Sequence, residues 1–248
     1  ILANTVTDVA GNLNTASTSS DNTVTVDLTR TLYLRSSGND ANDPDTSIND
    51  PSRPFATAQG VVDAVLALST APSAGDPLVI NVGAGSFGHV TLTSNFGEHV
   101  TWKGVSEATS IIGNIYANGT SGINGYNDPG TWDGMACTGT NTVTATSGSN
   151  GRTLYIQSNR TVYFGSIYSD GGDGGNGGSQ VAACDAIGTV GAPEGGASGG
   201  SAGSVTVNNA QTASIYLRGG NGGTGGTEYS GLNGSGGGNA GSGGSVVL

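Results

Sequence analysis

The sequence is short of charge, and above all of positive charge. Only 10% of its 248 residues are charged, and 7 Lys plus Arg stand against 18 Asp plus Glu, which gives a net charge of -11. A chain without a basic patch is a poor partner for nucleic acid. The sequence also lacks an apolar run of about 18 residues, so we expect no membrane span. Glycine, in contrast, is abundant, with 46 residues.

Most of the glycine belongs to a repeat near the C-terminus. Ser166-Ile167-Tyr168 precedes the run GGDGGNGG, and 48 residues later Ser214-Ile215-Tyr216 precedes GGNGGTGG. Each run leads into a second glycine run that ends in a short apolar segment, at 205–207 and at 246–248. A unit of this size cannot bury its own apolar face, so we expect successive units to stack.

The glycine runs have a period of three, which is the period of the polyproline II helix. Two glycines per turn leave two bare edges, so such helices can pack at backbone distance. We therefore predict ordered, polyproline II-like packing of the glycine loops, marked by Gly171, Gly174, Gly177, Gly219, Gly222 and Gly225. The alternative is a flexible Gly/Ser linker.

Cysteine is scarce, with Cys137 and Cys184 alone in the chain. They lie 47 residues apart, close to the 48-residue repeat, which would place them on neighbouring layers of a stack. Adjacent strands are about 4.8 Å apart, a separation that a disulfide can bridge. We predict that the two are bonded, which fits an extracellular protein. Two buried free thiols are the alternative.

The first 29 residues read as an extended segment separate from the rest. Residues 22–28 alternate with a period of two, and this stretch with 6–12 resembles the closing strands of bacterial Ig-like surface repeats. The sequence begins at Ile1 and not at methionine, so we expect a processed or excised piece of a longer chain. We take 1–29 as a linker or donor strand and 30–248 as one domain, glycine-rich from 171.

Residues 30–113 resemble the entry of right-handed parallel β-helix proteins of the pectate-lyase-like superfamily. The matching runs are 32–40, 54–59, 61–68 and the short alternating strands between 77 and 113. The resemblance implies an all-β fold, a right-handed parallel β-helix or solenoid. A short amphipathic helix from Phe55 to Leu68 would cap its N-terminal end, because an open end exposes apolar surface and strand edges.

The superfamily includes polysaccharide lyases and hydrolases, but residue patterns for catalysis are weak. Glycoside hydrolysis needs two carboxylates about 5–10 Å apart, and the central strands show no such pair. One loop could supply oxygen ligands for a structural Ca²⁺ through Asp40, Asp43, Asp45 and Asp50. The alternative is that this loop is a solvated polar turn. We assign His89 and His99 structural or surface roles, and we expect no catalytic residues or other cofactor.

The aromatic residues allow two interpretations. They could form a strip on which sugars stack, or they could be core and layer-stacking residues, which we favour. The residues concerned are Trp102, Tyr116, Tyr126, Trp132, Tyr163, Tyr168 and Tyr216.

We therefore expect a non-catalytic, extracellular structural element of a bacterial surface fibre or adhesin. Its partners would be copies of itself or other surface-protein domains, joined head-to-tail by β-strand addition. The alternatives are a glycan-binding adhesin module, with surface glycans as partners, and a polysaccharide lyase. The residues predicted to form the assembly contacts are Ile1, Val6, Val9, Val24, Val26, Leu28, Val246, Val247 and Leu248.

Overall fold

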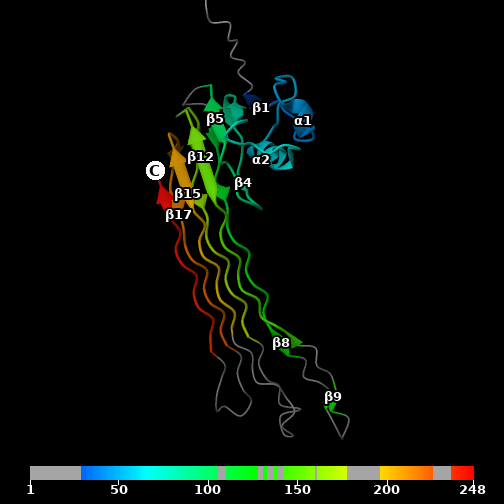
Figure 1. The fold of residues 1–248 in the computed structure, drawn as a ribbon, viewed down its shortest axis with the longest axis vertical. Helices are drawn as coiled ribbons and strands as arrows, with labels where there is room; N and C mark the ends of the chain where they lie inside the picture. Colours follow the sequence, from blue (N-terminus) through cyan, green and yellow to red (C-terminus); the bar gives the residue numbers. More distant parts are fainter. Residues whose placement is uncertain are drawn as a thin grey trace, which may run out of the picture.

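A computed structural model describes residues 29–105, 110–127, 131–132, 137–138, 142–159, 161–177, 196–225 and 236–248. It places the side chains of all of these except those within 126–143. The described part of the chain is built mostly of short strands in parallel sheets, as the sequence predicts, with long extended segments that project from them (Figure 1).

Three parallel sheets form the upper part of the molecule in Figure 1. Sheet 1 has six strands in the order β1 (Arg30–Leu34), β2 (Leu78–Val82), β5 (Val100–Gly104), β12 (Leu154–Ser158), β15 (Val205–Asn208) and β18 (Val246–Val247). Sheet 2 contains β3 (Gly85–Ser86), β6 (Ser110–Ile112), β13 (Tyr163–Phe164) and β16 (Gln211–Thr212). Sheet 3 contains β4 (Val90–Thr91), β7 (Ile115–Tyr116), β14 (Ile167–Tyr168) and β17 (Ile215–Tyr216).

The chain visits these sheets in the same order four times. Each pass takes one strand from sheet 1, then sheet 2, then sheet 3, and the passes are β2-β3-β4, β5-β6-β7, β12-β13-β14 and β15-β16-β17. Each strand pairs in parallel with its equivalent in the next pass. The sheets therefore grow in one direction, from β1 toward β18.

Alternation along the strands creates the core between the sheets. In β2 and β12 every second residue is buried, as expected for strands with one face turned inward. The inward side chains join one apolar cluster, whose largest fully buried members are Trp102, Phe55, Phe164, Leu32 and Leu34. Trp102 packs edge-on against Phe164, with ring centroids 5.7 Å apart.

The predicted helix near the N-terminus is confirmed as α2 (Ala58–Ala67), which contacts β1 and β4. Its buried face includes Val61, Val62 and Val65. The Thr57 hydroxyl caps its first turn by accepting a hydrogen bond from the Gly60 N–H at 2.9 Å. A second helix, α1 (Pro44–Ser47), was not expected, and Asp43 caps it.

Strand register confirms part of the predicted repeat and corrects another part. Tyr116, Tyr168 and Tyr216 lie at one register position in sheet 3, as their shared Ile-Tyr unit suggests. Leu154 pairs with Val205 in sheet 1. Residues 90–95 (VTLTSN) resemble 154–159 (LYIQSN), which suggests equivalent strands with Asn95 and Asn159 stacked. That interpretation is wrong, because Val90 lies in sheet 3 and pairs with Ile115, and Asn95 accepts a hydrogen bond from the Thr153 N–H.

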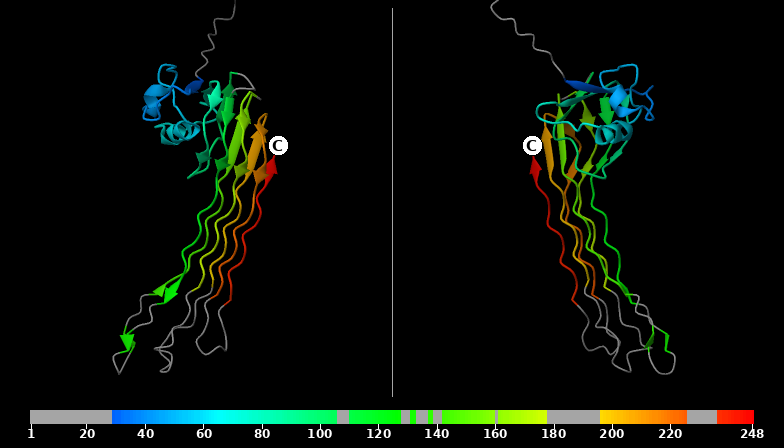
Figure 2. Two further views of the ribbon diagram at one scale, coloured as in Figure 1. Left: turned by 180° about the vertical axis from the view of Figure 1, so that it is seen from behind. Right: turned by 45° about the vertical axis from the view of Figure 1, so that its right-hand side comes forward.

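After sheet 3, the last three passes leave the sheets on long excursions. In the described residues these form six extended legs that lie side by side (Figures 1 and 2). We number them in chain order as leg 1 (117–125), leg 2 (144–153), leg 3 (169–177), leg 4 (196–204), leg 5 (217–225) and leg 6 (236–245). Beyond legs 1 and 2 lie two short antiparallel pairs, β8 (Tyr126–Asn127) with β11 (Thr142–Val143) and β9 (Thr131–Trp132) with β10 (Cys137–Thr138).

Candidate functional site

Backbone hydrogen bonds join each leg to the next. Thr120, Ser149, Gly172, Gly200, Gly220 and Gly241 form one row across all six legs, in which each N–H donates to the carbonyl of the preceding residue in the row at 2.8 to 2.9 Å. A second row of the same kind contains Ile123, Thr146, Gly175, Ala197, Gly223 and Gly238. The members of the two rows are three residues apart within each leg, which is the predicted period.

A second set of bonds joins each of legs 1 to 4 to the leg two further on. Gly171 and Gly174 of leg 3 donate to the carbonyls of Arg218 and Asn221 in leg 5, both at 2.8 Å. Gly199 of leg 4 donates to Asn239 of leg 6 at 2.9 Å. The legs therefore form two layers, one of odd-numbered and one of even-numbered legs, bonded within and between layers. We call this assembly the glycine slab.

The glycines are required because the legs approach at backbone distance. A Cβ on Gly174 would lie 2.0 Å from the Ala197 carbonyl oxygen in the next leg, and one on Gly175 would lie 1.9 Å from that of Ile123 in leg 1. The first glycine of a pair thus faces the next leg, and the second faces the leg two before. We call these the forward and backward positions, and a side chain at either would push two legs apart.

In legs 1 to 4, polar side chains at the third residue of a turn bond to the next leg in the same layer. Asn118, Asp170 and Asn176 accept, through their side-chain oxygens, from the N–H groups of Asp170, Arg218 and Thr224. Asp170 also pairs with the Arg218 guanidinium at 2.8 Å. This contact raises the pKa of Arg218, first through the hydrogen bond and then through charge. These third positions therefore form ladders of side-chain hydrogen bonds within each layer.

Three tyrosines on sheet 3 stack on one another. The ring centroids of Tyr116 and Tyr168 are 5.2 Å apart, and those of Tyr168 and Tyr216 are 4.8 Å apart, with nearly parallel planes. Each inner ring face is covered by the next ring, so a sugar cannot lie on it. The row is a layer-stacking ladder, the interpretation that we favoured, and Tyr216 at its end is 41% exposed.

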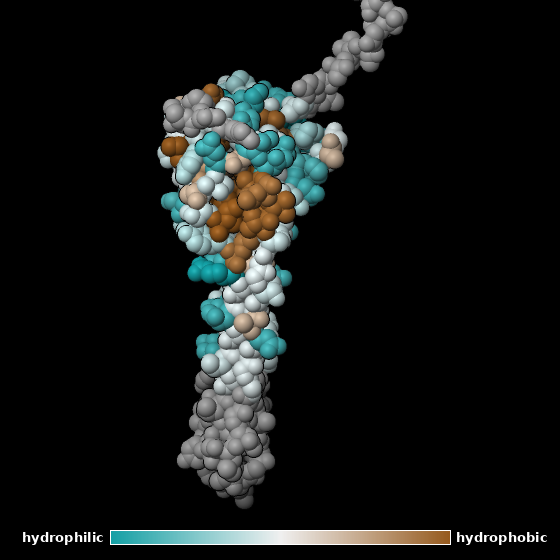
Figure 3. Space-filling view, turned by 90° about the vertical axis from the view of Figure 1, so that its left-hand side faces the viewer, coloured by the Kyte–Doolittle hydropathy of each residue, from teal (hydrophilic) through white to brown (hydrophobic). Residues whose placement is uncertain are grey.

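Apolar side chains gather where the sheets end. Val246, Val247 and Leu248 are 44%, 58% and 89% exposed, and Ile215 and Leu217 are partly buried beside them. Figure 3 looks onto this side of the molecule and shows the apolar patch on the sheets, above the pale glycine slab. Between Val205 and Leu217, and from 236 to 248, there is no charged residue. We call this surface the open end.

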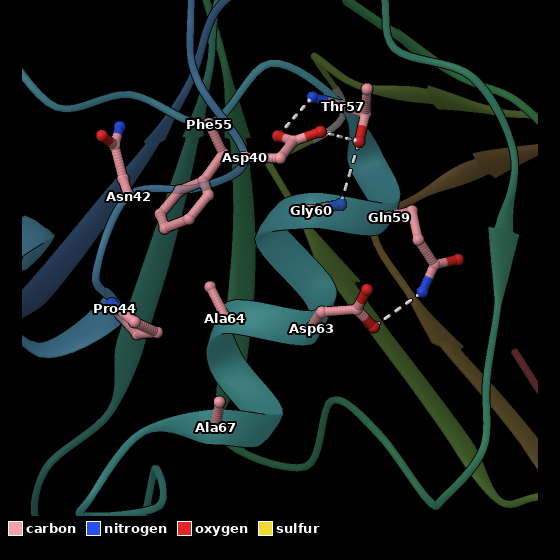
Figure 4. Close-up of a pocket in the computed structure, with 10 residues that line it drawn as sticks. All are labelled: Asp40, Asn42, Pro44, Phe55, Thr57, Gln59, Gly60, Asp63, Ala64 and Ala67. Carbon is pink, nitrogen blue, oxygen red and sulfur yellow. Dashed lines mark hydrogen bonds between the residues drawn. The ribbon is translucent and has the colours of Figure 1, made fainter.

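The four carboxylates proposed as Ca²⁺ ligands are not brought together. Asp40 bonds to the Ala56 and Thr57 N–H groups and to the Thr57 hydroxyl (Figure 4). Asp43 caps α1, Asp45 binds Ser69, and Asp50 binds Ser52 and Arg53. Within the described ranges no group of three or more His, Cys, Asp or Glu residues could hold a metal ion. These carboxylates fasten loops, whereas Asp63 in Figure 4 accepts a hydrogen bond from Gln59 within α2.

Two of these carboxyl groups have altered acidity. The Thr46 backbone N–H, together with its hydroxyl, holds the pKa of Asp43 below its usual 3.8. The Ser52 hydroxyl and backbone N–H lower the pKa of Asp50 in the same direction. Both groups are therefore ionised at neutral pH and hold their loops as anions.

The remaining predicted site residues are the two histidines, the two cysteines and the N-terminal assembly residues. The His89 ring accepts a hydrogen bond from the Asn114 N–H at 2.8 Å, and the His99 backbone carbonyl accepts one from the Leu78 N–H. Cys137 lies in β10, whereas Cys184 lies outside the described residues, so the disulfide stays a prediction. Ile1, Val6, Val9, Val24, Val26 and Leu28 also lie outside them.

Sequence reasoning missed legs 1 and 2 of the slab. Leg 1 reads ANGTSGING and has one glycine per turn, so the doubled-glycine signal is missing there. The available signal was the spacing of Gly119, Gly122 and Gly125, which is again three.

Comparison with known proteins places the chain in no group. No family model matches it, and neither a curated protein nor a solved structure is similar to it. The helices in the described part of the chain have 4 and 10 residues, too few for either to cross a bilayer.

Proposed function

We propose that this chain is a right-handed parallel β-helix that carries a slab of polyproline II-like legs, and that it serves as a non-catalytic structural part of a bacterial cell-surface fibre or adhesin. What supports the fold assignment is the fourfold order of strands through three parallel sheets, since crossover connections between parallel strands are almost always right-handed. The three-residue period of the hydrogen bonds between legs supports the assignment of the legs as polyproline II-like.

One observation carries the structural role. The last three passes each contribute two legs to the projecting slab, and the polar side chains described there bond mainly to neighbouring legs (Figure 2). Such a slab holds its far end at a fixed distance and direction from the sheets. An extracellular location fits the acidic composition with its 7 Lys plus Arg.

Assembly would proceed head-to-tail by β-strand addition at the open end. β18 lies at the edge of sheet 1 and exposes Val246 and Val247. Val24-Thr25-Val26 repeats the Val205-Thr206-Val207 sequence of the neighbouring strand β15. Asp27, Leu28 and Thr29 connect this segment to β1. In this proposal the segment of one copy extends sheet 1 of another.

Removing the donor segment tests this proposal. The full chain and a variant that lacks residues 1–28 would be compared by sedimentation and negative-stain microscopy over a range of concentrations. A Val24→Lys/Val26→Lys variant of the full chain serves as the point-substitution arm. We expect fibres or higher oligomers from the full chain alone. Polymers of the truncated chain, or a full chain that stays monomeric at high concentration, would contradict strand addition.

A further inference from the structure

Two basic residues lie together on the outer face of sheet 1, the face turned away from the core. The six strands of this sheet contain no Asp or Glu, although the chain has 18 acidic and 7 basic residues. Strand register places Tyr33, Asn81 and Lys103 side by side on β1, β2 and β5. Lys103 is exposed, and Arg35 follows directly after β1.

The Arg35 side chain is held in one orientation. Its Nη1 donates to the backbone oxygens of Leu34 and Asn81 at 2.8 and 2.6 Å, and its Nη2 donates to the Asn81 side-chain oxygen at 2.8 Å. The guanidinium carbon lies 5.4 Å from the centre of the Tyr33 ring, a cation–π distance. The stem passes over Gly83, where a Cβ would lie 2.7 Å from the Arg35 Cδ. The guanidinium is therefore fixed without a carboxylate partner.

These contacts leave a defined part of the guanidinium unused. A guanidinium has five N–H donors, and the three hydrogen bonds of Arg35 use both donors on Nη1 and one on Nη2. Because Nη1 and Nη2 both bond to Asn81, the end of the group faces that residue. The Nε–H and the second Nη2–H remain, and they form the side of the fork that binds two oxygens of one oxyanion.

Lys103 places a second positive charge beside this fork. Its register partner is Asn81, the residue that holds the guanidinium. Within the described part of the chain, the Lys103 ammonium has no hydrogen-bond or ion-pair partner, because the ion pairs there involve Arg30, Arg53 and Arg218. Neighbouring cations repel each other, so an anion that contacts both is favoured.

From this geometry we propose that Arg35 and Lys103 bind a phosphate group, either as the free ion or as the monoester of a larger ligand. The fork engages two phosphate oxygens, and the Lys103 ammonium engages a third. A carboxylate has two oxygens and would leave the ammonium unpaired. The charge of a phosphate monoester, about −2 at neutral pH, balances the two cations.

This site does not depend on the proposed fibre contact. It lies on the first three strands of sheet 1, whereas β18 is at the opposite edge of the sheet. It therefore adds a ligand-binding function to the structural role, and a chain that fails to polymerise would still bind phosphate.

Titration with inorganic phosphate tests the site directly. The backbone amide signals of the full chain would be followed by NMR at constant ionic strength, with sulfate, acetate and a sugar phosphate as further probes. We expect saturable shifts at Tyr33, Arg35, Asn81 and Lys103. Acetate should bind roughly tenfold more weakly than phosphate, because it lacks the oxygen that the ammonium would bind. A sugar phosphate that binds more tightly than inorganic phosphate supports an ester ligand, and equal binding supports the free ion.

Three variants separate the two cations from the overall charge. Lys103→Gln removes an exposed side chain without a partner, so the melting temperature should not change, and phosphate binding should weaken roughly tenfold. Arg35→Lys keeps the charge but loses the fork, and it should weaken binding as well. Arg218→Gln changes the net charge as Lys103→Gln does, but in the slab, and it should bind phosphate like the wild type.

Several results would overturn the proposal. These are the absence of saturable shifts, shifts confined to other residues, and phosphate binding by Lys103→Gln that equals that of the wild type. Acetate that binds as tightly as phosphate would identify a carboxylate site instead. If the same amide signals shift when the protein concentration is raised without phosphate, a carboxylate of another copy fills the fork, and the proposal is wrong.

Discussion

At the scale of single residues, the glycines of the slab let neighbouring legs approach at backbone distance, which any residue with a Cβ would prevent. Where one leg faces another, the Cβ position of the glycine is occupied by a neighbouring carbonyl group, so distance and not backbone flexibility requires glycine there. Among the described residues the glycines with a positive φ are Gly85 in β3 and Gly88 and Gly97 in connections between strands, and none of them lies in the slab.

A single valine should therefore separate two legs. We expect Gly174→Val to destabilise the protein by about 3 kcal/mol or more, because its Cβ would lie 2.0 Å from the Ala197 oxygen. The melting temperature would fall by roughly 6 °C or more. Gly236→Val is the matched control, since nothing lies within 4 Å of its Cβ. Equal melting temperatures for the two variants would show that the legs are not packed.

Acid should loosen the loop that holds α1. The pKa of Asp43 is lower in the folded protein than its usual 3.8, so its ionised form stabilises the fold above that value. This contribution disappears as the pH falls through the folded pKa. Asp43→Asn keeps a capping side chain but does not titrate. Melting temperatures measured at about pH 5 and about pH 2.5 should fall less in Asp43→Asn than in the wild type. An equal fall would exclude this role.

At the scale of elements, α2 depends on its first turn. Thr57 accepts from the Gly60 N–H and donates to Asp40 at 2.7 Å, which ties the helix to the acidic loop (Figure 4). Thr57→Ala should cost about 1 kcal/mol, or roughly 2–4 °C in melting temperature. Thr57→Ser retains both hydrogen bonds and should restore most of the loss. If serine is no better than alanine, the hydroxyl is not what holds the helix.

The elements also show how far the sequence could be interpreted alone. The Ile-Tyr unit and α2 were predictable, because a repeated short sequence and an amphipathic pattern can each be recognised within a few residues. The place of Val90 in sheet 3 was not, since two-residue strands with the same alternation fit any of the three sheets. The role of the Asp40 loop could not be read from composition, because carboxylates that bind backbone N–H groups and carboxylates that bind a metal give the same sequence pattern.

At the scale of the whole molecule, charge should control assembly. Copies with a net charge of -11 repel each other, whereas the open end, at 205–217 and 236–248, is uncharged. Salt screens the repulsion and leaves apolar contacts intact. We therefore expect self-association, measured by sedimentation, to strengthen from low salt to about 0.5 M NaCl. Weakening over this range would mean that ion pairs join the copies.

The central claim is that the glycine-rich legs form a hydrogen-bonded slab and not a flexible linker. Residue-resolved hydrogen exchange by NMR tests it most directly, because each donor can be followed separately. We predict slow exchange at Gly171, Gly172, Gly174 and Gly175, and in leg 6 slow exchange at Gly238 and Gly241 beside fast exchange at the forward positions Gly237 and Ala240. Uniformly fast exchange across 171–177, as in an unstructured peptide, would contradict the slab.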